Sequence, residues 1–323
     1  MRDFRKALLL YNPVSGGRAA GRRQAMTDVA ALLRYRVQEM RVEPTHRPGS
    51  AGQQARDAIH GGCEAIFVCG GDGTVFDALQ GVVGSKAALG VIPLGTGNVL
   101  ATDLGLPRHT LEAARCLLEF EPRRIAVGRI RCNEGTLTRY FSVAAGAGVH
   151  AELIYRSSAR AKRAGGVRAY YVVGLGLLLR HKFIPFEVEI GDADGQMHRE
   201  TVLEMMAMRV SSFGGILSRL RPGGALEKPH LQVGVLRRSS RIGMLRYVVD
   251  AILGLARPKE HTSSGADVGF LAARRVVCRA LPGESGRIRV QADGELLGEM
   301  PAEIEVVPDA LTLMMPPARA ETR

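Results

Sequence analysis

The chain has 323 residues, a hydrophobic content of 46% and a formal net charge of +12 at neutral pH. This length suits two domains of ordinary size, and the apolar content excludes an intrinsically disordered chain. The basic excess favours an acidic partner, which is a nucleic acid, a nucleotide or an anionic membrane surface. Because tryptophan is absent and aromatic residues make up only 5%, stacking on single-stranded bases is disfavoured, and we expect no nucleic-acid partner.

Cysteine usage and hydropathy favour a cytoplasmic protein. The five cysteines include no CxxC pair, which is typical of reduced thiols. The first apolar run, Ala7–Leu10, ends at Asn12-Pro13, too early for a signal peptide. The longest apolar run, Tyr170 to Leu179, has about half the length that a bilayer span needs. We therefore expect a cytoplasmic chain that crosses no membrane, with peripheral membrane contact left open.

The N-terminal part alternates between strands and helices. The predicted strands are Lys6–Tyr11, Tyr35–Glu43, 64–69 and Ala88–Leu94. The predicted helices are Arg18–Leu33, Gly49–Ile59, a segment that ends near Val83, a segment after Asn98, and Leu111–Phe120. Such alternation predicts a parallel, three-layer α/β domain over residues 1–122.

The pattern changes to period-two alternation after Pro122. The strand candidates are Ile125–Cys132, Thr138–Ala145, Phe186–Ile190, Val202–Val210, Leu231–Leu236, Val276–Ala280, Arg287–Ala292 and Ile304–Val307. Two helical intervals, Val167–His181 and Gly243–Leu255, interrupt them. We expect an antiparallel β-sandwich domain over residues 123–310, followed by a closing strand and tail over residues 311–323.

Glycine or hydroxyl residues follow four successive N-terminal strands. They are Asn12 with Ser15, Gly16 and Gly17; Thr45 with Gly49; Gly70, Gly71, Asp72, Gly73 and Thr74; and Gly95, Thr96, Gly97 and Asn98. Loops at the carboxyl ends of parallel strands line one crevice, where glycine lets the backbone approach a ligand. Amides at a helix start attract anions, so the four loops together predict a nucleotide site. The absence of GxxxxGK[ST] and of a well-placed GxGxxG excludes a P-loop and an ordinary dinucleotide site.

Asp72 is the acidic member of the third loop. A carboxylate beside a phosphate is repelled unless Mg²⁺ or a proton donor lies between them. This residue therefore indicates nucleotide chemistry more than plain binding.

Four motifs occur in an order that resembles the lipid kinases of the diacylglycerol kinase and sphingosine kinase type, and above all their soluble bacterial members. The motifs are Asn12-Pro13-Val14-Ser15-Gly16-Gly17, Gly70-Gly71-Asp72-Gly73-Thr74, Pro93-Leu94-Gly95-Thr96-Gly97-Asn98 and Asp293-Gly294-Glu295. The resemblance covers residues 5 to 316, including a closing strand at Leu311–Pro316. The Gly-Gly-Asp-Gly-Thr motif alone is shared with NAD kinases, so the specificity comes from the four together.

The resemblance implies that Thr45, the Gly70–Asp77 loop and Thr96 hold ATP, bordered by Asn12 and by Ser15-Gly16-Gly17. It also implies that Asp72 binds or positions the catalytic Mg²⁺. The carboxylate of Glu295 is expected to be the general base, with Asp293 beside it, because a lipid alcohol must lose its proton as the phosphoryl group is transferred. By composition alone, Asp293-Gly294-Glu295 is typical of a turn between strands.

One stretch departs from the bacterial pattern. Those relatives carry an acidic residue in a segment resembling Asp-Gly-x-Leu, which holds a structural Mg²⁺ together with main-chain oxygens. The equivalent here is Glu227–Gln232, where Lys228 replaces the acid. An ammonium cannot ligate a hard cation. Either Lys228 supplies the charge, or Glu227 is a shifted ligand, or the site is lost, and we favour its loss.

Two basic runs are either solvated faces or contacts to anionic lipid. They are Arg156, Arg160, Lys162, Arg163 and Arg168, and Arg237, Arg238, Arg241 and Arg246. The sequence thus predicts a kinase of lipid metabolism that transfers the γ-phosphoryl of ATP to a diacylglycerol-like or sphingoid lipid. The alternatives are an NAD kinase-like enzyme and a non-catalytic nucleotide- or lipid-binding regulator. The sequence leaves open which lipid is used and whether a homodimer forms.

Overall fold

The computed structural model describes residues 3–16, 21–161, 176, 184–212, 224–237, 268–283 and 287–317. The chain forms two compact units, one of Met1–Val127 with Pro308–Arg323 and one of Gly128–Val307. Two long strands, β5 (Glu121–Cys132) and β15 (Ala302–Met315), contribute residues to both units. Within the described residues, no helix is long and apolar enough to cross a membrane.

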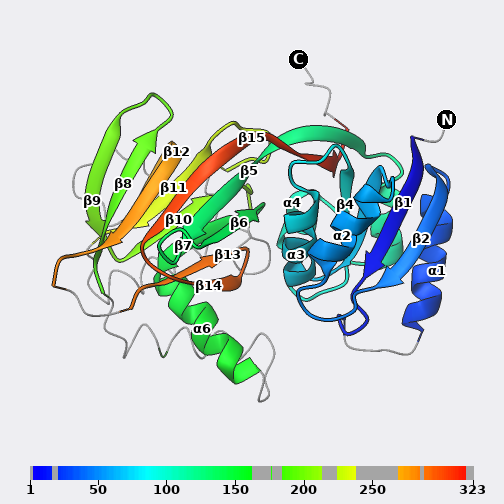
Figure 1. Ribbon diagram of the computed structural model, residues 1–323, viewed down its shortest axis with the longest axis horizontal. Helices are drawn as coiled ribbons and strands as arrows, with labels where there is room; N and C mark the ends of the chain where they lie inside the picture. The colour runs from blue at the N-terminus through cyan, green and yellow to red at the C-terminus, as the bar shows by residue number, and fades with distance from the viewer. Residues whose placement is uncertain are drawn as a thin grey trace. The chain divides into compact units, whose positions relative to one another are not determined.

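The first unit is built on a parallel sheet in the order β15-β4-β3-β1-β2 (Figure 1). Its strands are β1 (Phe4–Tyr11), β2 (Val37–Pro44), β3 (Ala65–Gly70), β4 (Ala88–Pro93) and the end of β15, which pairs with β4 through Thr312 and Leu313. Every residue of β3 and β4 is buried. Continuous apolar strands of this kind are typical of a parallel sheet that is covered on both faces.

Helices cover this sheet in two groups. They are α1 (Arg22–Leu33), α2 (Ala51–His60), α3 (Asp72–Val82), α4 (Val99–Asp103) and α5 (Thr110–Cys116). Helix α1 contacts α5, and α2 contacts α3. Because β1-α1-β2 and β2-α2-β3 run in opposite directions across the sheet, right-handed crossovers place α1 and α2 on opposite faces. The predicted three-layer arrangement is confirmed.

The strand register aligns the carboxyl ends of this sheet. Tyr11 pairs with Pro44 on one side and with Cys69 on the other, and Gly70 pairs with Pro93. From β1 the chain passes outward to β2 and then returns to β3 on the other side of β1. The switch point of the topology therefore lies between the ends of β1 and β3, which is where open α/β sheets bind ligands.

The second unit is built from antiparallel strands. Its main sheet runs β14-β13-β7-β10-β11-β12-β15, and β8–β9 and β5–β6 add hairpins to it. The remaining strands are β6 (Leu137–Phe141), β7 (Ala144–Gly148), β8 (Phe186–Asp192), β9 (Met197–Val202), β10 (Glu204–Met208), β11 (Leu231–Leu236), β12 (Val268–Ala280), β13 (Arg289–Ala292) and β14 (Glu295–Glu299). Helix α6 (Val149–Ala161) follows β7 and contacts β13 and β14 (Figure 1). The predicted antiparallel β-rich half is confirmed.

Several element predictions differ from the structure. The expected strand Thr138–Ala145 is broken between Phe141 and Ala144, because the amides there bind the Asp293 carboxylate instead of a neighbouring strand. Strand β9 was not predicted, since its exposed edge sequence is mostly polar. Helix α6 and strand β14 were not predicted either, and Ile304–Val307 joins the closing strand in one element, β15. The predicted helices Val167–His181 and Gly243–Leu255 lie outside the described residues, apart from Gly176.

Candidate functional site

Asn12, directly after β1, joins the first and third glycine loops. Its side-chain amide donates to the Thr74 hydroxyl at 3.1 Å, and its side-chain oxygen accepts the Val14 amide at 3.0 Å. Gly16 has a φ of +76°, and a Cβ there would lie 2.7 Å from the Leu94 carbonyl oxygen. The first loop therefore also approaches the residue that precedes Gly95. Ser15 lies in the same turn, whereas Gly17 lies outside the described residues.

The third and fourth loops touch through glycine backbones. A Cβ on Gly95 would lie 2.5 Å from the Cα of Gly71, so a side chain there would push the two loops apart. Asn98 closes the fourth loop on itself: its side chain accepts the Gly95 amide at 2.9 Å and donates to the Gly95 carbonyl at 2.7 Å. Asn98 adopts a left-handed conformation with φ 50°, which asparagine tolerates better than most residues.

Asp72 binds these two loops together. Its carboxylate accepts the amides of Asn98 at 2.8 Å and Val99 at 2.7 Å. Burial raises the pKa of this carboxyl, although the two amide hydrogen bonds act in the opposite direction. The resemblance implies that Asp72 binds or positions the catalytic Mg²⁺. The structure adds a role in fixing the Gly95–Asn98 loop, and a carboxylate keeps further acceptor capacity after one hydrogen bond to each oxygen.

The other predicted ATP residues lie at the same edge of the sheet. The Thr45 amide donates to the carbonyl of Tyr11 at 2.8 Å, which places the start of the second loop beside the first. Gly70 ends β3, Gly73 and Thr74 lie in the first turn of α3, and Thr96 and Gly97 are exposed in the fourth loop. The first unit thus brings together every predicted ATP residue that the structure describes.

Asp293 lies in the second unit, where its carboxylate binds a segment about 150 positions earlier. It accepts the amides of Ser142, Val143 and Ala144, each at 2.9 Å, and the Ser142 hydroxyl at 3.2 Å. Burial raises the pKa of Asp293 to about 6, although these hydrogen bonds lower it. The carboxylate is therefore engaged with main chain, and its geometry is that of a positioning residue.

Glu295 begins β14 on the other side of a tight hairpin. Asp293 and Gly294, with φ of 48° and 86°, are the two central residues, and Ala292 pairs with Glu295 across the turn. Positive φ at both positions is the signature of a type I′ turn, for which Asp-Gly is a preferred sequence. The turn interpretation of this motif is thus correct for its backbone. The turn leaves Glu295 exposed at the start of the edge strand β14.

Two domain families account for nearly the whole chain. Residues 6–130 match the diacylglycerol kinase catalytic domain. Residues 142–315, more than half of the chain, match the YegS C-terminal NAD kinase beta sandwich-like domain. The chain belongs to the diacylglycerol kinase family. The family assignment confirms the expectation of a lipid kinase, and ATP binding is implied by that family.

Curated relatives and solved structures agree with this assignment. A diacylglycerol kinase of Bacillus subtilis (strain 168) is 27% identical over 321 residues, which cover 98% of this chain and 99% of the relative. A diacylglycerol kinase of Mycobacterium tuberculosis (strain CDC 1551 / Oshkosh) is 29% identical over 97% of this chain and 96% of its own. A crystal structure of a diacylglycerol kinase from Bacillus anthracis str. Sterne has a TM-score of 0.71 at 20% identity and covers 99% of this chain and 100% of its own, which shows the shared fold.

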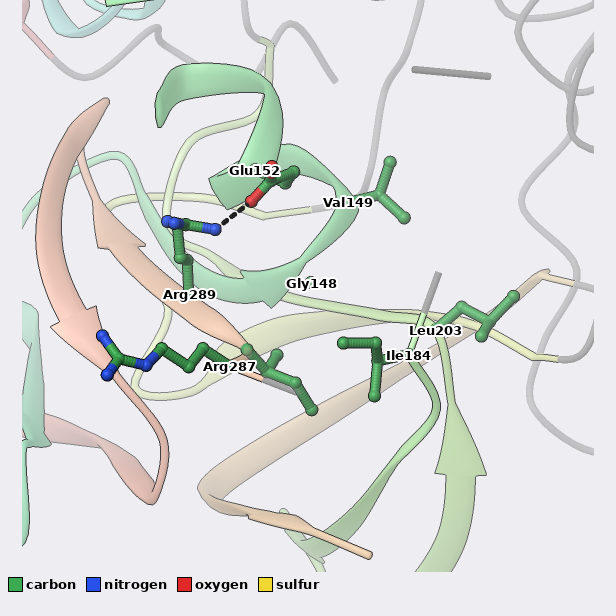
Figure 2. Close-up of a pocket in the computed structure, with 8 residues that line it drawn as sticks. Gly148, Val149, Glu152, Ile184, Leu203, Arg287 and Arg289 are labelled. Atoms are coloured by element: carbon green, nitrogen blue, oxygen red, sulfur yellow. Dashed lines mark hydrogen bonds and ion pairs between the residues drawn. The ribbon is translucent and has the colours of Figure 1, made fainter. Parts of the chain in front are cut away.

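The second unit of this family member contains a pocket with both apolar and charged lining (Figure 2). The lining residues are Gly148, Val149, Glu152, Ile184, Leu203, Arg287, Ile288 and Arg289. Figure 2 shows Arg289 directed toward Glu152, with which it forms an ion pair, and the Arg289 guanidinium lies 3.7 Å from the ring centre of Tyr155. Burial alone would raise the pKa of Glu152, but Arg156 and Arg289 hold it below its usual range.

Glu204, the first residue of β10, is a buried carboxyl that sequence patterns did not single out. Its Oε2 accepts the His150 amide at 2.8 Å in the first turn of α6, and its Oε1 is buried without a hydrogen-bond partner in the described part of the chain. Burial raises the pKa of Glu204 to about 8, against the amides of His150 and Val149, which lower it. The folded protein therefore holds a proton here at pH values at which the solvated glutamate of an unfolded chain has already released it.

We expect the Glu204→Gln variant to lose less stability than the natural protein as the pH rises from 5 to 8. Between the unfolded and folded pKa values the native state binds more protons, so the free energy of unfolding falls as the pH rises, by an amount on the order of 4 kcal/mol over the full window. Glutamine cannot ionise and removes this dependence. Denaturant unfolding at several pH values measures the difference. Glu119→Gln, at an exposed site, is the control, and equal pH slopes for Glu204→Gln and the natural protein would contradict the assignment.

Two other side chains support the loops without having been predicted to do so. Arg22 is buried and donates to the Pro13 carbonyl of the first loop. It shares the buried face of α1 with Met26 and Val29, and that spacing was the available signal. Asp77 accepts the Ala51 amide at 2.6 Å and so supports the start of α2.

Proposed function

We propose that the chain transfers the γ-phosphoryl group of ATP to a hydroxyl of a diacylglycerol-like or sphingoid lipid. The observation that carries this proposal is the joining of the first, third and fourth loops at the switch point of a parallel sheet. Asn12 bonds Thr74, Gly71 contacts Gly95, and Asp72 binds the amides that follow Gly97. Exposed glycine backbone at a switch point suits the phosphates of a nucleotide.

The proposed ATP residues have separate roles. The amides of the Gly70–Thr74 and Gly95–Asn98 loops would bind phosphate oxygens, and Thr45 and Thr96 offer hydroxyls beside them. Asp72 would hold Mg²⁺ through its remaining lone pairs. No cluster of three or more His, Cys, Asp or Glu side chains suited to a metal occurs among the residues described, and Mg²⁺ in kinases is commonly held by one or two carboxylates and substrate phosphates. The ion would neutralise charge on the transferring phosphoryl group.

We propose that Glu295 accepts the proton of the attacking lipid hydroxyl. Its exposure at the start of β14 leaves it accessible to a substrate, and the hairpin holds its backbone in place. Asp293 would act through that hairpin, because its carboxylate anchors the turn to Ser142–Ala144. A base on a defined turn suits proton transfer, which depends on a short and aligned contact.

The lipid side of the proposal rests on the second unit. The pocket of Figure 2 combines aliphatic side chains with Arg287 and Arg289, a lining that suits the polar end of a lipid and its first methylenes. Peripheral contact with an anionic membrane is proposed from the two basic runs. Their described members Arg156 and Arg237 form ion pairs with Glu152 and Glu200, so any net attraction would come from the remaining members, which lie largely outside the described residues.

Transfer of labelled phosphate to defined acceptors tests the proposal. The full chain is incubated with γ-phosphate-labelled ATP, Mg²⁺ and mixed micelles that contain a diacylglycerol, a monoacylglycerol or a sphingoid base, and separately with NAD. We expect label in a lipid acceptor and none in NAD. Label in NAD alone would favour the NAD kinase-like alternative. A protein that binds ATP but labels no acceptor would favour the non-catalytic regulator.

A further inference from the structure

Three main-chain carbonyls of the loop before β11 converge on one buried cation. The Arg209 guanidinium donates through Nη1 to the carbonyls of Lys228 and His230, both at 2.7 Å, and through Nη2 to the carbonyl of Leu226 at 2.5 Å. Carbonyls from alternate residues that point to one centre are ligands of the kind that hard cations take. Here the planar fork of an arginine, which carries five N–H donors, binds them instead.

The position of Arg209 is interior. The residue is 0% exposed and is the largest fully buried side chain of the described chain. Burial lowers the pKa of its guanidinium to about 10, so the group remains a cation at neutral pH. The loop packs closely on the end of β10, since a Cβ on Gly224 would lie 2.4 Å from the Val210 carbonyl oxygen. The cation and its carbonyl ligands are thus enclosed together.

The side chains that the sequence had suggested for this site are elsewhere. Lys228 and Glu227 are both exposed, so neither side chain fills the interior position. Burial lowers the pKa of the His230 imidazole, and the charges of Lys228, Arg209 and Arg274 lower it further. A divalent ion would have to displace Arg209 from its carbonyls and enter an already positive region. The residues present therefore do not fit the structural Mg²⁺ that the resemblance implies.

Arg209 is also linked to the segment that holds Asp293. Its amide donates to the Val143 carbonyl at 2.8 Å, and the Val143 amide donates to the Asp293 carboxylate at 2.9 Å. We propose that Arg209 is a permanent internal cation, which takes the place of a structural divalent ion and ties the 224–230 loop to the strand beside the Asp293 hairpin. Arg209 is a positioning residue in this scheme, and the proposal does not depend on which acceptor the enzyme phosphorylates.

Thermal unfolding without nucleotide tests this proposal, with Mg²⁺ or with EDTA. The natural protein should have the same Tm in both conditions. Arg209→Met, which keeps an unbranched apolar stem but leaves three buried carbonyls without their donor, should lower Tm by about 5 °C or more. Lys228→Ala, at an exposed position of the same loop, is the matched control and should leave Tm unchanged.

A second variant asks whether the carbonyls form a cation site once Arg209 is removed. Arg209→Glu places a carboxylate at the interior position that faces these carbonyls, and we expect its Tm to rise with Mg²⁺ relative to EDTA. A purely packing role for Arg209 would produce no such rise, and its absence would contradict the proposal. If Arg209→Met does not fold, the effect of Mg²⁺ on the Tm of the natural protein still tests the proposal. A Tm increase with Mg²⁺ that persists after Asp72→Asn would place an ion outside the proposed ATP site and overturn the inference.

Discussion

Glu295→Gln is expected to lower kcat by about 10²- to 10⁴-fold, the range that a positioned general base contributes. Glutamine has nearly the same shape but cannot accept the proton of the lipid hydroxyl. The residue lies in the second unit, outside the four loops of the first, so the affinity for ATP should stay close to that of the natural protein. Initial rates with a saturating lipid acceptor and a separate nucleotide-binding titration measure the two quantities.

Glu299→Gln is the matched control for this prediction. Glu299 ends the same strand, β14, and pairs with Arg289 in the ladder, so its substitution perturbs the hairpin without touching the proposed base. We expect its kcat to remain within a few-fold of the natural value. Near-natural kcat in Glu295→Gln would remove this residue from the chemistry, and an equal loss in both variants would point to damage of the hairpin.

Asp72→Asn is expected to reduce kcat/KM for ATP by about 10²-fold. The carboxylate accepts two amides, from Asn98 and Val99, and an asparagine amide offers only one oxygen for them. One buried donor then loses its acceptor, which costs about 1–3 kcal/mol and loosens the Gly95–Asn98 loop. Steady-state kinetics at varied ATP and varied Mg²⁺ measure both the loss and its dependence on the metal.

The Mg²⁺ titration separates the two roles of Asp72. If Asp72 also ligates the ion, the variant needs a higher Mg²⁺ concentration for half-maximal activity. An unchanged Mg²⁺ dependence would contradict the metal role and leave only the role in fixing the loop. Asp28→Asn is the control, because Asp28 lies on the exposed side of α1, where it accepts a hydrogen bond from Gln24.

The nucleotide half could be predicted because its signals are local. An apolar run such as Ile66–Cys69 followed by Gly70–Thr74 specifies a buried strand, a close turn and a helix within a dozen residues. Parallel pairing then places the carboxyl ends of successive strands at one edge. What local patterns could not give was the engagement of Asp72 with the fourth loop, 26 positions away. The same holds for the hydrogen bond from Arg22 to the Pro13 carbonyl, because it depends on how α1 packs beside the first loop.

In the Asp293-Gly294-Glu295 motif, the backbone conformation could be predicted from the sequence, but the partners of the Asp293 side chain could not. Its turn was predictable, since Asp293-Gly294 is a preferred pair for positive φ at two positions. The destination of the Asp293 carboxylate was not, because the amides it binds lie 149 to 151 positions earlier and are released from strand pairing by the break between β6 and β7. The expectation that Asp293 stands beside Glu295 in catalysis stays a prediction, now with a specific positioning role.

The sequence by itself determined the family, the order of strands and helices in the first unit, and the four glycine loops, because periodicity and backbone preferences act over short stretches. Only the tertiary structure decided which groups satisfy the buried polar atoms. Lys228 was the visible departure in the sequence, yet Arg209, about twenty positions earlier, binds the carbonyls of its loop. The physical reason is that a buried carbonyl needs a donor or a cation, and any residue that the fold brings within hydrogen-bonding distance can supply it.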